Sequence, residues 1–199
     1  MAQDSRNSAL RPPSASRKES ELEIVIGIKQ FAHDQVMRHI AERFSGHDLA
    51  RLVAAVLTAE NFQVEVAGPG PDGGVDILAS KGMLGFDGPH ICVQVKSSKH
   101  PEDVVTLRAL QGTMKNFKAD QGLLVAWGGF TKALIREARQ SHFQLRLWSA
   151  QELVDAVYRS YDSLPEEIQV ELRLEKVWVL TTEDMHNKQS RQICSLNRE

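Results

Sequence analysis

Two stretches of sequence, DGGVDILAS at residues 72–80 and ICVQVK at residues 91–96, carry the strongest indication of the fold. In the second stretch apolar and polar side chains alternate, which is the period of a β-strand with two different faces. Gln94 and Lys96 therefore project together from the polar face. In the first stretch Asp76 interrupts an apolar run, and a carboxylate there is costly to bury without a partner. If the two strands pair with their polar faces in register, these three side chains converge.

The rest of the chain alternates between helical and extended hydrophobic periods. The pattern predicts helices at residues 21–43 (one long helix or two short ones), 49–57, 101–117, 131–140 and 150–158. It predicts strands at residues 62–66, 75–80, 91–97, 122–127 and 143–148, and beyond Pro165 it indicates a helix at 168–174 and a strand at 177–180. This order predicts an α/β sandwich with a mixed sheet.

The composition excludes several classes of protein. The 199 residues carry 24 Lys and Arg against 26 Asp and Glu, so the chain is not a wholly basic nucleic-acid binder. No apolar stretch approaches the roughly 18 residues of a membrane span, and the polar N-terminus lacks the apolar region of a secretory signal. Cys92 and Cys194 form no CxxC pair, which argues against a zinc finger and a disulfide framework. We therefore expect a cytoplasmic protein without membrane association.

The three converging side chains offer a carboxylate, an amide oxygen and an ammonium group. Mg²⁺ prefers hard oxygen ligands, so Asp76, Gln94 and the backbone carbonyl of Val95 are candidate ligands for Mg²⁺ or Mn²⁺. A metal at this place could polarise a phosphodiester, while Lys96 orients the attacking water or offsets the developing negative charge. The predicted reaction is phosphodiester hydrolysis.

The same residues resemble a known family. Asp72-Gly73-Gly74-Val75-Asp76 followed by Val93-Gln94-Val95-Lys96 is similar to the DGGxD…QxK form of the PD-(D/E)xK nuclease superfamily, specifically of Mrr-like restriction endonucleases. The resemblance covers about Phe44 to Tyr158 and implies a restriction-endonuclease-like αβββαβ core with a mixed central sheet flanked by helices. It also implies a metal-binding role for Asp76 and Gln94.

The resemblance further implies a catalytic role for Lys96 and an activity. That activity is a Mg²⁺-dependent endodeoxyribonuclease of the type IV restriction kind, which cuts double-stranded DNA, methylated DNA included, in defence against foreign DNA. A homodimer, or a separate recognition domain or subunit, is the implied assembly. The expected organisation begins with a disordered leader at residues 1–20 and an N-terminal helical segment at residues 21–46. The nuclease domain follows at residues 47–160, then a C-terminal extension at residues 161–180 and a disordered tail at residues 181–199.

Two departures from the family pattern motivate an alternative function. Gln94 replaces the acidic residue of the wider superfamily, and Ala50 stands where relatives often place a glutamate on the first core helix, with Asp48 as the nearest substitute. The alternative is a catalytically weak or inactive module that keeps the nuclease fold and binds DNA or another protein.

Some of the site residues have ordinary structural explanations. Asp76 could cap a glycine turn, and Asp72, the other accessory candidate, is typical of a turn residue that bonds its own backbone. Residues 68–73 contain a literal GxGxxG, but Pro69 and Pro71 remove two N–H donors and a strand follows where a dinucleotide-binding fold needs a helix. We reject the dinucleotide-binding interpretation.

A local excess of basic residues follows the candidate site. Between His90 and Lys118 the chain carries five basic residues against two acidic ones. Lys99 and Lys115 are candidate contacts to DNA phosphates, and a solvated helix face is the alternative explanation.

Overall fold

The computed structural model describes residues 15–68 and 74–177, with side chains described from residue 23 onward. Its contacts divide the chain into two units, one made of Met1–Gln35 with Glu175–Glu199 and the other of Val36–Leu174. Helix α1 (Ala15–Arg43) begins in the first unit and ends in the second. The second unit holds the sheet and every described candidate site residue.

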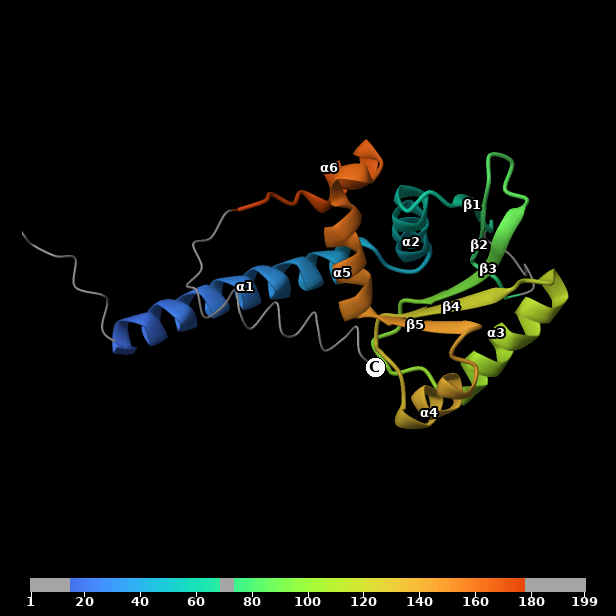
Figure 1. Ribbon diagram of the computed structural model, residues 1–199, viewed down its shortest axis with the longest axis horizontal. Helices are drawn as coiled ribbons and strands as arrows, with labels where there is room; N and C mark the ends of the chain where they lie inside the picture. Colours follow the sequence, from blue (N-terminus) through green and yellow to red (C-terminus); the bar gives the residue numbers. More distant parts are fainter. Residues whose placement is uncertain (1–14, 69–73, 178–199) are drawn as a thin grey trace, which may run out of the picture. The chain divides into compact units, whose positions relative to one another are not determined.

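The second unit is built on one five-stranded sheet (Figure 1). Its strands, in spatial and chain order, are β1 (Gln63–Val66), β2 (Ile77–Lys81), β3 (Asp87–Lys96), β4 (Gln121–Ala126) and β5 (Leu145–Ser149). The first three strands pair antiparallel and the last three pair parallel, so the sheet is mixed, as the sequence predicts.

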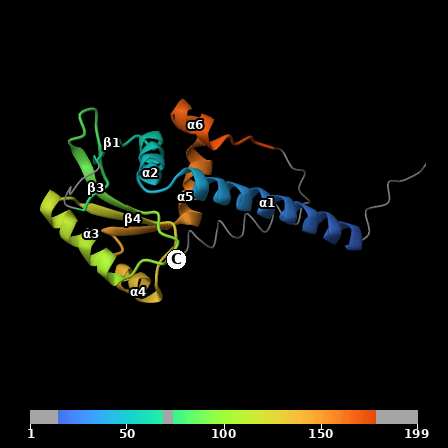
Figure 2. The ribbon, with the colours of Figure 1, turned by 180° about the vertical axis from the view of Figure 1, so that it is seen from behind.

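Helices cover both faces of this sheet (Figures 1 and 2). They are α2 (His47–Ala59), α3 (Val104–Phe117), α4 (Lys132–Gln140), α5 (Ala150–Ser160) and α6 (Glu166–Leu172), with a 3₁₀ turn at Tyr161–Ser163. One hydrophobic core joins α2, α5 and α6 to one sheet face, and a second joins α3 and α4 to the other. The α/β sandwich and its element order are confirmed.

Helices α2 and α3 form for local reasons that can be read from the sequence. The apolar positions of α2 at i, i+3, i+4, i+7 and i+8 are all buried (Leu49, Leu52, Val53, Val56 and Leu57). Helix α3 begins at Val104 rather than at Pro101, because the carboxylate of Asp103 accepts a hydrogen bond from the backbone N–H of Val105 at 3.0 Å. Such an N-cap satisfies a donor that the first turn otherwise leaves unpaired, and Pro101 supplies no such acceptor.

The chain ends differ in part from expectation. Helix α1 is continuous through Gly27 and begins at Ala15, inside the stretch expected as a leader, because the residues that open it are good helix formers. Residues 1–14, residues 178–199 and Asp72 lie outside the described part of the chain, and with them most of the strand expected at 177–180. No helix in the described part is long and apolar enough to cross a membrane.

Candidate active site

The candidate site lies where β2 begins and β3 ends. The two strands pair with Ile77 opposite Val93, and the backbone N–H of Asp76 donates to the carbonyl of Val93 at 2.9 Å. Continuing this register by one residue places Asp76 opposite Gln94. Because side chains alternate along a strand, Asp76, Gln94 and Lys96 project from the same sheet face, the one that α3 and α4 cover.

Asp76 is fixed by a hydrogen bond that crosses between the strands. Its Oδ2 atom accepts from the backbone N–H of Val95 at 2.7 Å. Its backbone carbonyl accepts from the N–H of Ala67, which follows β1, at 2.9 Å. The carboxylate is therefore held against the backbone of Val95, the residue whose carbonyl is the third candidate metal ligand.

Gln94 is buried, and its amide oxygen lacks a partner. Its side chain is 7% exposed, and Oε1 accepts no hydrogen bond within the described residues. A buried polar atom without a partner is costly, and each such atom in a folded protein needs an explanation. An oxygen in that state, opposite a carboxylate, is chemically suited to a hard cation.

Lys96 is the last residue of β3 and is half-buried. Its backbone pairs with Ala126 of β4, and its carbonyl accepts from the N–H of Trp127 at 2.8 Å. This pairing fixes the backbone from which the ammonium group projects. Lys96 takes part in none of the ion pairs recorded for the described residues, so no carboxylate there neutralises it.

The loops that follow β3 and β4 are joined to each other. The backbone N–H of Glu102 donates to the carbonyl of Gly129 at 2.9 Å, and the N–H of Thr131 donates to the carbonyl of Glu102 at 3.0 Å. A Cβ on Gly128 would collide with the backbone of Lys99 and His100. The loop that carries exposed Lys99 is thus packed against the loop that follows β4.

Lys115 lies in a different place from Lys99. Helix α3 connects the end of β3 to the start of β4, two parallel strands, so its last turn lies at the opposite end of the sheet from Lys96. Lys115 is in that last turn, where it lines a hollow of about 450 Å³ with Lys118. The structure therefore separates the two candidate phosphate contacts by the length of α3.

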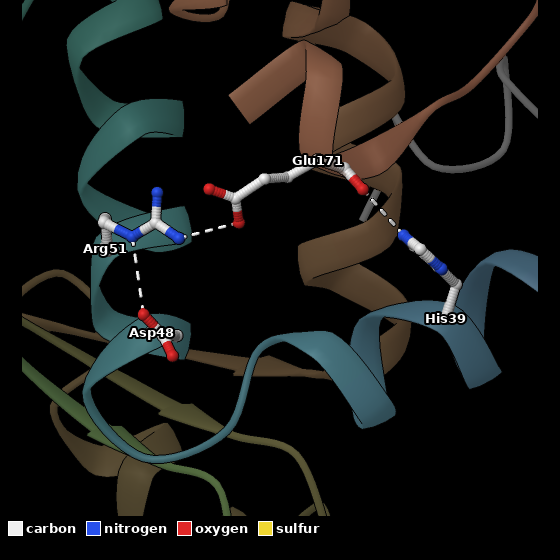
Figure 3. A network of polar contacts seen from close by, with 4 residues as sticks. All are labelled: His39, Asp48, Arg51 and Glu171. Atoms are coloured by element: carbon white, nitrogen blue, oxygen red, sulfur yellow. Dashed lines mark hydrogen bonds and ion pairs between the residues drawn. The ribbon is translucent and has the colours of Figure 1, made fainter. Parts of the chain in front are cut away.

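Asp48 belongs to a network of polar contacts with His39, Arg51 and Glu171 (Figure 3). Its Oδ1 atom lies 3.5 Å from Nε of Arg51, whose Nη2 donates to Oε2 of Glu171 at 2.7 Å, and Nε2 of His39 lies 2.8 Å from the Glu171 carbonyl oxygen. The hydrogen bond from Arg51 lowers the pKa of the Glu171 carboxyl. The network ties α2 to α6 and to the end of α1, and no recorded contact brings Asp48 to Asp76.

Among the described residues, the oxygen donors near Asp76 are one carboxylate, its own, and the neutral oxygens of Gln94 and Val95. Within the described ranges no group of three or more His, Cys, Asp or Glu side chains is placed to hold a metal ion. The physical reason is that Gln94 occupies the position opposite Asp76, so the second side-chain oxygen is an amide. The orphaned Oε1 atom fits a divalent cation, and the single negative charge implies weaker binding than two carboxylates would give.

The family model for restriction endonucleases of the Mrr_cat type matches residues 41–157. The chain belongs to this family. The resemblance inferred from the DGGxD and QxK residues is thus confirmed, and residues 41–157 contain every described candidate site residue.

Three individual proteins are similar to this chain, and each of them is similar over less than half of its own length. A mitochondrial protein of Schizosaccharomyces pombe, described as uncharacterized, is 32% identical over 100 residues, which are 48% of this chain and 40% of the yeast protein. The solved DNA modification-dependent restriction endonuclease AspBHI is 15% identical with a TM-score of 0.50 over 85% of this chain and 43% of its own. The MspJI restriction endonuclease in complex with a 27-mer oligonucleotide has a TM-score of 0.41 at 15% identity, over 94% of this chain and 42% of its own. The chain thus spans less than half of each, and AspBHI supports the fold.

One buried residue beside the site was not identified from the sequence. Thr113 of α3 is 5% exposed and lies on the helix face that also carries Leu110 and Met114. A polar residue on an apolar helix face was the available signal. The signal was insufficient because a threonine hydroxyl often bonds its own helix, as Thr113 does with the carbonyl of Ala109.

Proposed function

We propose that this member of the restriction endonuclease family hydrolyses phosphodiester bonds of double-stranded DNA with Mg²⁺ or Mn²⁺. The observation that carries the proposal is the unpartnered, buried Oε1 atom of Gln94, opposite the Asp76 carboxylate at the start of a strand pair. A bound divalent ion would supply Lewis-acid polarisation of the phosphodiester. The ligands would be Asp76, Gln94 and the carbonyl oxygen of Val95.

In this proposal each side chain has a separate task. Asp76 contributes the negative charge, and its bond to the N–H of Val95 keeps the carboxylate oriented. Gln94 contributes a neutral oxygen. Lys96, which is not neutralised by a described carboxylate, places its ammonium group beside the attacked phosphate and offsets the charge that develops there.

The substrate and the assembly are also part of the proposal. Modified DNA is a candidate substrate because AspBHI, whose fold this chain shares, is a modification-dependent enzyme. Lys99, beside the end of β3, would contact a phosphate near the cut, whereas Lys115 would contact one farther along the duplex. Cutting both strands favours two copies of the chain or a separate recognition domain or subunit. We propose a cytoplasmic role in restriction of foreign DNA.

A second candidate function is a nuclease-fold module that binds DNA without cutting it. The observation that favours it is the charge of the site, in which an amide stands opposite Asp76 and buried Ala50 offers no carboxylate from α2. A metal site with one carboxylate binds divalent ions more weakly. Metal binding therefore separates the two candidates.

The test is cleavage of supercoiled plasmid, methylated and unmethylated, with Mg²⁺, with Mn²⁺ and with EDTA. The Lys96→Ala variant should lose cleavage by about a hundredfold or more, since charge stabilisation of this kind typically contributes that much. Its matched control is Lys132→Ala, which removes an exposed lysine at the start of α4 and should cut like the wild type. Absence of cutting under every condition, together with no calorimetric binding of either ion, would favour the non-catalytic module.

A further inference from the structure

Two of the buried polar side chains, Gln94 and Thr113, each approach the same glycine, Gly74. The described residues include three buried polar side chains, Gln94, Thr113 and Ser160, and the Ser160 hydroxyl is satisfied by the carbonyl of Ala156 in its own helix at 2.9 Å. Thr113 Oγ1 and Gln94 Nε2 lie 3.4 and 4.0 Å from the position that a Cβ on Gly74 would occupy. Gly74 has a φ of +82°, which glycine adopts without strain. The backbone before Asp76 thus passes close to both side chains.

The polarity of these atoms is complementary. The Thr113 hydroxyl donates its one hydrogen to the carbonyl of Ala109 at 3.2 Å, so toward other neighbours its oxygen acts as an acceptor. The atom of Gln94 that approaches this side is the amide nitrogen, which is a donor. The amide oxygen is then turned away from Gly74 and is the atom left without a partner.

An amide needs such an orientation at a metal site, whereas a carboxylate does not. The two oxygens of a carboxylate are equivalent, but an amide turned by 180° presents N–H groups, which repel a cation. Groups that orient a metal ligand from behind typically change metal affinity by about 10–100-fold when they are removed. A glutamine ligand therefore gains from a fixed acceptor on its nitrogen side.

We propose that Thr113 is a positioning residue that turns the Gln94 amide so that Oε1 faces the metal ion. The inference rests on the proposed function, because it assumes that a divalent ion binds between Asp76 and Gln94. Thr113 acts through Gln94 and touches neither the ion nor DNA. Thr113, on helix α3, thereby compensates for the presence of Gln94 where the wider superfamily has an acidic residue.

The test is calorimetric titration of the full chain with Mn²⁺ and Mg²⁺ in the absence of DNA. Thr113→Val keeps the shape of the side chain but removes the hydroxyl, and its Kd should rise about tenfold. Thr113→Ser, the matched control, keeps the hydroxyl and should bind within about threefold of the wild type. Thr113→Ala is a second variant without the hydroxyl, and thermal melting shows which variants are folded.

The decisive comparison repeats Thr113→Val in a Gln94→Glu background. A carboxylate needs no orientation, so the Kd should then change by less than about twofold, whereas a merely structural role would lower the melting temperature in both backgrounds and leave the Kd unchanged. Equal Kd values for the wild type and Thr113→Val, or equal losses in both backgrounds, would overturn the positioning role alone. A wild-type chain that binds neither ion would overturn the proposed function and this inference with it.

Discussion

At the scale of the residue, Asp76 combines a charge with a hydrogen bond, and the two can be separated. Asp76→Asn keeps an oxygen that can accept from the N–H of Val95, so we expect a folded protein whose metal affinity falls by more than about tenfold. Asp76→Ala also leaves that N–H without its acceptor and should lower the free energy of unfolding by a further amount of about 1–3 kcal/mol. Calorimetry and denaturant unfolding measure the two effects. Metal binding by Asp76→Asn at wild-type affinity would remove this carboxylate from the site.

At the scale of the element, the two loops that follow β3 and β4 depend on a close approach at Gly128. In Gly128→Ala the new Cβ would meet the backbone of Lys99 and His100, so one of the two loops must move. We expect the free energy of unfolding to fall by about 1–3 kcal/mol and DNA affinity to fall with it, since Lys99 is displaced. Gly112→Ala in α3 is the control, because nothing lies near its Cβ and the change should stabilise the helix by about 0.5–1 kcal/mol. Unchanged unfolding and DNA binding in Gly128→Ala would contradict this account of the loop.

At the scale of the whole molecule, the network of His39, Asp48, Arg51 and Glu171 joins three helices on one side of the sheet (Figure 3). Arg51 lowers the pKa of Glu171, so the ionised carboxylate stabilises the folded chain at pH values above 4.5, the ordinary value for glutamate. Glu171→Gln should therefore be less stable than the wild type at neutral pH. The difference should disappear as the pH falls below 4.5 through the lowered pKa of the folded state.

Unfolding curves measured from pH 7 to pH 3 with roughly constant ionic strength check this dependence. The control is Glu167→Gln, which removes an exposed carboxylate from the same helix. A difference between the wild type and Glu171→Gln that persisted unchanged at low pH would show that the Arg51 ion pair is not its source.

The amino-acid sequence alone was enough to predict the αβββαβ order, the mixed sheet and the common face of Gln94 and Lys96. These follow from side-chain period and turn residues, which are local properties of the chain. Asp76 was identified in the same way, because a carboxylate stands out in an apolar strand. The boundaries were less accurate, as the start of α3 shows: Asp103 caps this helix, and Pro101 lies outside it.

Which distant residues come together could be learned from the folded structure alone. It brought Thr113 and Gln94 close to the same glycine, engaged Asp48 with Arg51, and placed Lys99 before the start of α3 and Lys115 in its last turn. The physical reason is that such contacts depend on how each helix packs on the sheet, and this packing is set by the hydrophobic cores of the whole second unit. Side-chain period fixes the face of a strand, but it carries no information about the helix residue that will lie across from it.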